Sequence, residues 1–166
     1  MRKFKNLVLI AIITLGFTAA NAQQKIGHIS TDKLLSIMPE TKAMNAELEK
    51  LSKTYETELK AEQAKLQAKL KKYDEEAKTQ TDEVNQQRGV EVQQDQQKLY
   101  QSSQAARDDL SKKRNEKLKP ILDKAKKAID EVAKEQGFTY VLEASTLIVA
   151  NGTDLLPAVK AKLGLK

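Results

Sequence analysis

The side chains most able to support specific chemistry in this sequence are charged and suited to binding. Eight basic residues lie between Lys112 and Lys127, against only Glu116 and Asp123. They are Lys112, Lys113, Arg114, Lys117, Lys119, Lys124, Lys126 and Lys127. Such a cluster could bind anionic lipid, lipopolysaccharide or acidic polypeptide segments. The alternative is a solvated helical face with i,i+4 charge pairs. Nucleic acid is disfavoured because no aromatic residues are interleaved with the cluster.

The residues that most enzymes and metal sites require are missing or isolated. The chain has no cysteine and one histidine, His28, which argues against thiol catalysis, zinc binding and a Ser-His-Asp triad. It contains no GxxxxGK[ST] or GxGxxG motif and no calcium-binding loop. No pair of carboxylates lies in an apolar setting suited to acid–base work. We therefore predict no enzymatic activity, no metal and no cofactor. His28 is expected to be an ordinary strand residue, with a pH-sensitive role as the alternative.

The first 22 residues predict an export signal. Arg2, Lys3 and Lys5 precede an uncharged, largely apolar run, LVLIAIITLGF at 7–17, and Ala20-Asn21-Ala22 is a small-x-small cleavage site. Cleavage after Ala22 leaves 26 basic against 23 acidic residues. The apolar run is too short to span a bilayer of about 30 Å as a helix, although a retained N-terminal anchor is the alternative. We expect the mature protein to be exported, with the absence of cysteine avoiding oxidative pairing.

Two long segments on either side of Gly89 predict helices. Residues 40–87 contain neither Gly nor Pro and are rich in strong helix formers. Apolar residues recur there mostly at steps of 3, 4 or 7, typical of a coiled-coil seam, with a four-residue stutter around Tyr55. About 45 residues would form a helix of roughly 65–70 Å. Residues 90–136 show a similar pattern, and Pro120 is expected to bend that helix or begin a new segment.

The simplest arrangement is an antiparallel hairpin over residues 40–136 with its tip near 85–95, close to Gly89 and a Gln-rich stretch. One continuous helix is the rival. Residues 23–39 and 137–166 would form a small β-rich body from which the hairpin projects. Strands are predicted at 25–30, 138–142 and 147–150, with Gly137 ending the preceding helix and Asp154 capping a final one. The predicted fold class is mainly α.

A body of about 47 residues is close to the size at which a lone hydrophobic core fails. Its three short strands would also leave sheet edges exposed. A long two-helix hairpin has little core of its own. These features predict self-association through the body, for example in a closed ring or barrel of strands from several subunits.

Two stretches resemble the Skp/OmpH-like periplasmic chaperone family. The first is IGHISTDKLL at 26–35, followed by Met38-Pro39-Glu40. The second is PILDK at 120–124, leading to IDEVAKEQGFTYVL at 129–142. The similarity extends over the whole mature chain in the order strand, helical hairpin, strands and terminal helix.

The resemblance implies a periplasmic homotrimer that holds unfolded outer-membrane proteins between coiled-coil tentacles, without ATP, and prevents their aggregation during transit to the outer membrane. Carried over by position, the oligomerisation body would include Ile26, His28, Ile29, Leu34, Leu35, Ile37, Phe138, Tyr140, Leu142, Leu147 and Val149. The chain departs from the family in its tip, where Asp82–Asp95 has a net charge of about −3. Family tentacles are often strongly basic near the tip. The alternative function is a structural coiled-coil scaffold of the envelope that binds a folded partner.

Most apolar residues of the hairpin are expected to hold its two helices together. Those near the predicted tip are better candidates for contact with clients, because the seam is thin there and surrounded by glutamine. The candidate client-binding residues are Val84, Val90, Val92, Leu99 and Tyr100. Many weak contacts of this kind can retain an extended chain by avidity.

Overall fold

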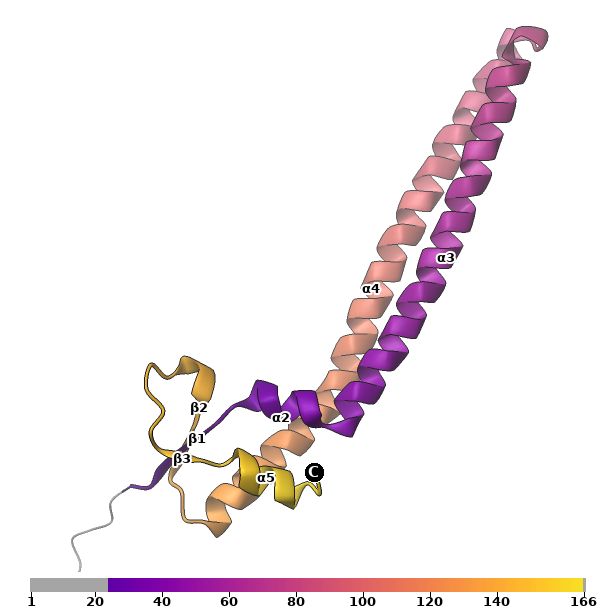
Figure 1. Ribbon diagram of the computed structural model, residues 1–166. Coiled ribbons are helices and arrows are strands. Elements are labelled where there is room, and N and C mark those ends of the chain that lie inside the picture. Colours follow the sequence, from indigo (N-terminus) through magenta and orange to yellow (C-terminus); the bar gives the residue numbers. More distant parts are fainter. Residues whose placement is uncertain (1–23, 166) are drawn as a thin grey trace, which may run out of the picture. The chain divides into compact units, whose positions relative to one another are not determined.

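A computed structural model describes residues 24–165; the predicted signal peptide lies outside these described residues. The chain divides into two compact units. The first is a small mixed α/β unit of residues 24–31 and 127–165, and the second is a helical unit of residues 32–126. The ribbon in Figure 1 labels their helices and strands. The predicted fold class, a long helical hairpin accompanied by a small β-containing part, is confirmed.

The small unit is organised by a three-stranded parallel sheet. Its order is β2-β1-β3, with β1 at Ile26–Ile29, β2 at Tyr140–Glu143 and β3 at Thr153–Asp154. Ile26 pairs with Tyr140 and His28 with Leu142, so these four side chains share one face of the sheet. The exposed fractions of Ile26, Tyr140 and Leu142 are 50%, 52% and 40%. One sheet face therefore presents apolar side chains to solvent.

The opposite face of the sheet forms the core of the small unit. Ile29, Phe138, Leu155 and Val159 are all buried, the last from helix α5 (Leu156–Lys162). A Cβ atom on Gly27 would overlap Leu155 Cδ1 and lie 3.0 Å from Phe138 Cε1. The central strand can therefore approach these two side chains only because it carries glycine there.

The strand predicted at 147–150 is wrong. These residues form an irregular loop, and Ile148 and Val149 are highly exposed. Thr153–Asp154 pairs with β1 instead, and the Leu155 amide donates to the His28 carbonyl at 2.9 Å. Because this pairing occupies one edge of β1 and β2 occupies the other, the apolar run at 147–150 has no ladder partner on β1.

The ends of the other elements follow local signals in the sequence. Gly137 has φ +71°, as expected for a residue that ends a helix, and Phe138 N donates to Ala133 O at 2.8 Å. The predicted strand at 138–142 is observed at 140–143, and Phe138, just before it, is buried in the core. A 3₁₀ turn, η3 (Ala144–Thr146), follows β2. Asp154 Oδ1 accepts from Leu156 N at 2.9 Å at the start of α5, as predicted.

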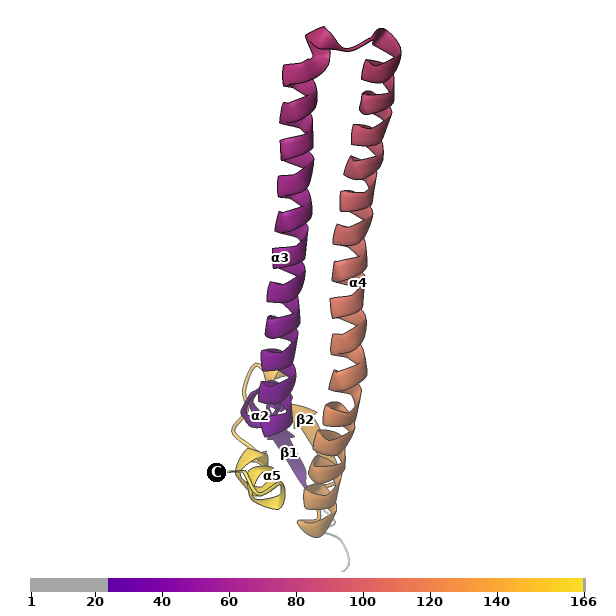
Figure 2. The same ribbon diagram turned by 90° about the vertical axis from the view of Figure 1, so that its right-hand side faces the viewer.

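The helical unit is an antiparallel hairpin. Helix α2 (Thr31–Ile37) leads to α3 (Pro39–Glu76), a 3₁₀ turn η2 (Ala77–Thr79) and the 54-residue helix α4 (Asp82–Glu135). Figures 1 and 2 show α3 and α4 side by side, joined at the end of α3 by the short turn. Pro39 begins α3. Proline is tolerated there because an N–H at the first helical position has no partner within the helix. Pro120 lies inside α4, so the new helical segment that was one of the two alternatives predicted for it does not form.

The predicted position of the tip is wrong. The chain reverses at residues 77–81, whereas Gly89 and the whole of 85–95 lie inside α4. Thr81 starts that helix: its Oγ1 accepts from Val84 N at 3.3 Å, and its carbonyl accepts from Asn85 N at 3.0 Å. Gly89 has no positive φ and serves as an ordinary helical residue. The alternative of one continuous helix is excluded by the same turn.

The boundaries between the two units lie at 31/32 and 126/127 in the chain, whereas the sequence predicts boundaries at 39/40 and 136/137. The last residues of α4 belong to the small unit because Ala128, Val132 and Ala133 are buried there. Leu34, Leu35 and Ile37, expected in the body, belong to the helical unit.

Candidate functional site

Polar contacts hold α3 and α4 in one register. Glu76 pairs with Arg88 at 2.5 Å, and Glu47 with Lys117 at 2.9 Å. Further pairs across the two helices are Tyr73 OH–Glu91 at 2.5 Å, Tyr55 OH–Asp109 at 2.7 Å, Lys69–Asp95 and Glu40–Lys124. The two residue numbers of every pair add up to 164. The pairing register of the two helices is therefore constant from Glu40–Lys124 to Glu76–Arg88. Each residue faces the one equally distant in sequence on the other side of position 82.

The hairpin has very little dry core between its helices. Met44, Ile121 and Ala125 are buried near its base, but no residue from Asn45 to Pro120 reaches this degree of burial. The apolar seam residues in that stretch are only half-buried; they include Leu48, Leu51, Leu59, Leu66, Leu99, Ala106, Leu110 and Leu118. Apolar surface that a normal core would cover thus stays accessible along the hairpin.

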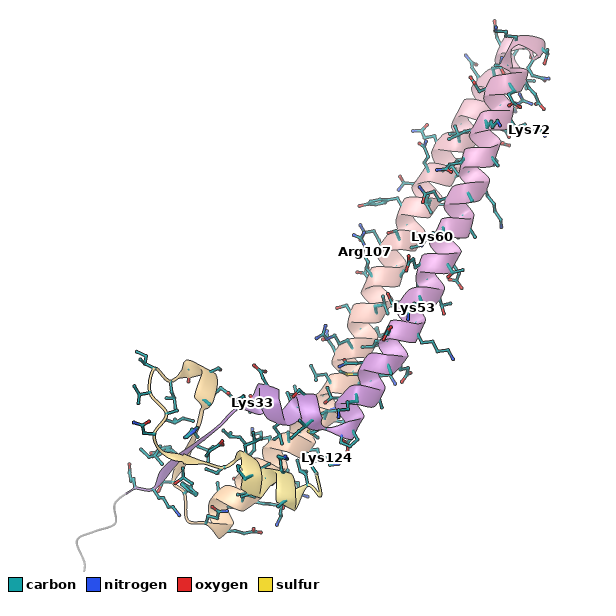
Figure 3. All side chains as sticks on the ribbon, viewed as in Figure 1. Lys33, Lys53, Lys60, Lys72, Arg107 and Lys124 are labelled. Carbon is teal, nitrogen blue, oxygen red and sulfur yellow. The ribbon has the colours of Figure 1, made fainter. Side chains whose placement is uncertain are left out.

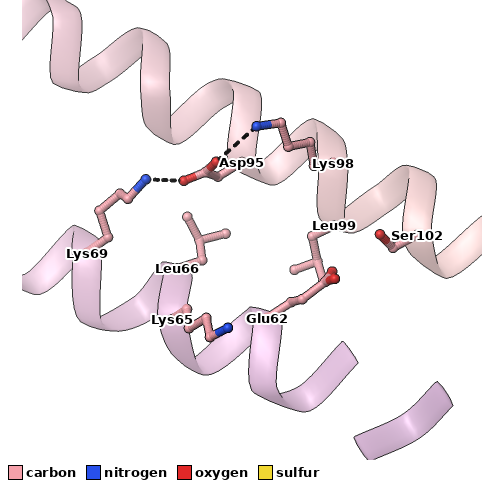
Figure 4. Close-up of a pocket in the computed structure, with 8 residues that line it drawn as sticks. All are labelled: Glu62, Lys65, Leu66, Lys69, Asp95, Lys98, Leu99 and Ser102. Atoms are coloured by element: carbon pink, nitrogen blue, oxygen red, sulfur yellow. Dashed lines mark hydrogen bonds and ion pairs between the residues drawn. The ribbon is translucent and has the colours of Figure 1, made fainter. Parts of the chain in front are cut away.

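Three cavities of the same construction lie along this seam, and we call them together the hairpin groove. The largest, about 470 Å³, has Leu66 and Leu99 at its floor and the Lys69–Asp95–Lys98 ion pairs on its rim, as Figure 4 shows. A cavity of about 350 Å³ around Leu59 and Ala106 shares Glu62 and Ser102 with it. A third, about 440 Å³, contains Met44 and Ile121.

Each cavity of the hairpin groove is built in the same way. Residues i, i+3, i+4 and i+7 of α3 face their register partners on α4, beginning at Glu40, Tyr55 and Glu62. This is the pattern of a hole in knobs-into-holes packing, here without a knob from a described residue. The groove can therefore receive apolar side chains from another molecule and surround them with charged groups of both signs.

The five residues predicted to contact clients do not form one surface. Leu99 lines the hairpin groove. Val84 and Val92 are half-buried, whereas Val90 and Tyr100 are 53% and 60% exposed and line none of its cavities. None of the five lies at the turn itself.

The basic cluster is also divided. Lys113 pairs with Asp109 at 3.1 Å, and Lys117 and Lys124 pair with glutamates of α3. Arg114 lines another cavity, of about 340 Å³, beside Leu48, and Lys127 belongs to the small unit. Lys112, Lys119 and Lys126 remain exposed at seven-residue intervals, which places them on one side of α4. Other charges are distributed along the hairpin, including Lys53, Lys60 and Lys72 on α3 and Arg107 on α4 (Figure 3).

Several carboxylates that link the helices titrate below their ordinary range. The hydrogen bond from Lys69 lowers the pKa of Asp95, that from Tyr55 lowers the pKa of Asp109, and that from Lys124 lowers the pKa of Glu40. The hydrogen bond to Asp109 raises the pKa of Tyr55, and the hydrogen bond to Glu91 raises the pKa of Tyr73, since the neutral phenol is the donor in each. These groups therefore favour the paired hairpin while the carboxylates are ionised.

We predict that acid loosens the hairpin. A carboxylate whose pKa is depressed on folding contributes stability above its unfolded value of about 3.9, and this contribution is lost as the pH falls through the folded pKa. Circular dichroism during acid titration should show a helical transition below about pH 4. Asp109→Asn should make that transition less steep, whereas Glu116→Gln, which removes a carboxylate without an ion pair to a described residue, should not. Equal profiles for both variants would contradict the role of Asp109.

The floor of the hairpin groove is not evident from the sequence. There, the apolar spacing shows only that residues such as Met44, Leu59, Leu66 and Ile121 belong to the seam. The missing signal was the register, because an apolar spacing on one helix does not say which residues of the other helix face it. Among residues 24–165, no helix is sufficiently long and apolar to span a bilayer, and no cluster of potential metal ligands occurs.

Both the sequence and the fold of this chain are similar to those of known proteins. A family model described as outer membrane protein (OmpH-like) matches residues 25–163. A crystal structure from Caulobacter crescentus CB15, described as an OmpH-like outer membrane chaperone, has a TM-score of 0.75 at 19% identity; the match covers 87% of this chain and 86% of that one. No curated protein matches significantly. The family match spans nearly the whole described chain and confirms the resemblance found in the sequence, so this protein belongs to the OmpH-like outer membrane protein family.

Proposed function

We propose that this protein is an exported, ATP-independent, non-enzymatic holdase chaperone of the periplasm, which binds unfolded outer-membrane proteins and prevents their aggregation. The observation that carries the proposal is the hairpin groove. It offers half-buried apolar residues such as Leu66 and Leu99 at several points along a helix pair with little core. Family membership supports a chaperone role.

The groove suits an unfolded client better than a single folded partner. Its cavities are open to solvent and distributed along the hairpin, so several weak contacts retain the chain by avidity. Its rims carry both charge signs, as at Lys69 and Asp95, which accommodates varied sequences. Release then requires no nucleotide, because folding or insertion of the client removes the apolar segments from the groove.

We further propose that the small unit assembles the chaperone into a homotrimer. Ile29 and Phe138 are buried in the core of the small unit and cannot contact another subunit. The residues available for such a contact are therefore the exposed apolar ones. These are Ile26, Tyr140 and Leu142 on the sheet face, together with Ile148 and Val149 in the following loop. The outer edges of β2 and β3 are likewise without a strand partner among the described residues. Association would cover both features.

The exposed lysine row of α4 is proposed as a secondary contact for anionic lipid or lipopolysaccharide, or for acidic client segments. Lys112, Lys119 and Lys126 form no ion pair with a described residue, and Leu122, 44% exposed, lies between the last two in sequence. An exposed leucine among unpaired lysines suits an amphipathic anionic surface. This contact would be screened by salt.

The proposal is tested by measuring the mass of the signal-free protein in solution, alone and after dilution of a urea-unfolded outer-membrane barrel protein into it. A trimer that keeps the barrel protein soluble without ATP is the expected result. A trimer that ignores several unfolded barrel proteins but binds one folded envelope protein would favour the scaffold alternative. A folded monomer would overturn the assembly proposed for the small unit.

The assembly makes its own prediction. The double substitution Tyr140→Ser and Leu142→Ser should reduce the mass to that of a monomer, because it removes apolar area from the exposed sheet face while leaving the core residues in place. Sedimentation velocity provides the measurement. Thr139→Ser, also at an exposed position, should remain trimeric. An unchanged mass for the double variant would show that this face is not the interface.

A further inference from the structure

The loop before β3 contains the one Asn-Gly pair of the chain, Asn151-Gly152. Both residues are exposed, and the loop has no regular secondary structure. Glycine after asparagine leaves the next backbone nitrogen sterically open to approach the side-chain amide. Neither the Asn151 side chain nor the Gly152 amide has a hydrogen bond to a described residue.

We propose that Asn151 is a site of spontaneous deamidation that marks the age of the folded protein. The Gly152 nitrogen, after losing its proton to solvent, attacks Asn151 Cγ; the new C–N bond forms as the amide C–N bond breaks and ammonia leaves. Water then opens the resulting succinimide at either carbonyl, giving aspartate or isoaspartate. One water is consumed, one ammonia is released, and nothing is oxidised or reduced. This site is independent of the proposed chaperone function.

The structure distinguishes this asparagine from the others that it describes. Asn45 lies in α3, and Asn85 and Asn115 lie in α4, where the following amide is fixed in the helical hydrogen-bond ladder. The Asn85 side chain is also engaged, since its Nδ2 donates to Ala77 O at 2.9 Å. These three residues therefore serve as internal controls within the same molecule.

The reaction would alter the edge of the sheet. Aspartate at position 151 adds a negative charge three residues before Asp154, whose carboxylate already starts α5. Isoaspartate also adds a methylene to the main chain directly before β3. Because β3 is only two residues long and pairs through Thr153 and Asp154, a longer connection should weaken its register against β1.

The test is incubation of the intact folded protein at mildly alkaline pH, followed by peptide mass mapping and cation exchange. The expected result is a more acidic species with a mass increase of about 1 Da confined to the Asn151 peptide. Gly152→Ala should suppress it. The structure accommodates that alanine, since its Cβ would lie 3.7 Å from His28 Nδ1 and the backbone φ is not positive.

Two outcomes would overturn the proposal. One is conversion of Asn45, Asn85 or Asn115 as rapidly as Asn151 in the folded protein. The other is an unchanged Asn151 in the folded protein at a time when the same chain in urea has converted, which would mean that the fold protects the loop. Hydrogen exchange of residues 153–154 in the aged sample should be at least several-fold faster than in fresh protein if β3 is loosened.

Discussion

Gly27→Ala is expected to unfold the small unit while leaving the hairpin helical. The added methyl group would overlap the end of the Leu155 side chain and crowd the Phe138 ring, and both residues are buried in the core. Overpacking of a fitted core costs about 1–3 kcal/mol, and a core this small has little reserve stability. Hydrogen exchange of β1 and β2 would report the loss separately from the hairpin.

The matched control for that substitution is Gly152→Ala, which also adds a methyl group beside β1 but meets only ordinary contacts. It should leave exchange in the sheet close to that of the parent protein. Protection of the strands in Gly27→Ala equal to that in the control would refute the close packing described for the central strand.

The second large effect concerns the hairpin groove. Ser102 lines both the cavity around Leu66 and the one around Leu59. Ser102→Phe should fill them with the protein's own side chain, which blocks clients while adding apolar contacts between the helices. We expect client affinity to fall at least tenfold, equivalent to about 1.4 kcal/mol, with the melting temperature unchanged or raised. Competition binding with an unfolded barrel protein and thermal denaturation together separate the two effects.

A complementary comparison identifies which apolar residues matter. Leu66→Ser with Leu99→Ser should weaken client retention, whereas Val90→Ser with Tyr100→Ser should have a smaller effect, since the latter pair lines none of the groove's cavities. If the Val90 and Tyr100 variant loses retention and Ser102→Phe does not, clients bind to the exposed side of α4 and the groove is not the site.

Much of the fold could be predicted from local signals. The helices followed from composition and apolar spacing, and Gly137 and Asp154 behaved as expected at helix ends. The sequence predicts the turn too far along the chain because Gly89 is the only helix-disfavouring residue between the two long apolar patterns. An exposed glycine in a long helix costs only about 1 kcal/mol, so it does not dictate a reversal. The better signal was Thr81-Asp82-Glu83, a capping residue followed by acidic residues in the first turn.

Other features depended on pairings that no single segment reveals. Leu147–Ala150 has a strand-like composition, but β1 was already paired through Thr153–Asp154, so composition could not decide between them. The candidate site depended on register in the same way. Leu66 and Leu99 become neighbours in one cavity only when the turn is placed correctly, and a tip at Gly89 would have brought different residues together.

The constant sum of 164 along the hairpin limits how its length can change during evolution. An insertion in α3 alone would shift every residue on one side of it relative to α4. Ion pairs such as Glu47–Lys117 and Glu76–Arg88 could then not all form. Equal insertions at register-matched points of both arms would preserve all of them. Lineages should therefore lengthen or shorten this hairpin in coupled steps of seven or eleven residues per arm, about 10 or 16 Å each.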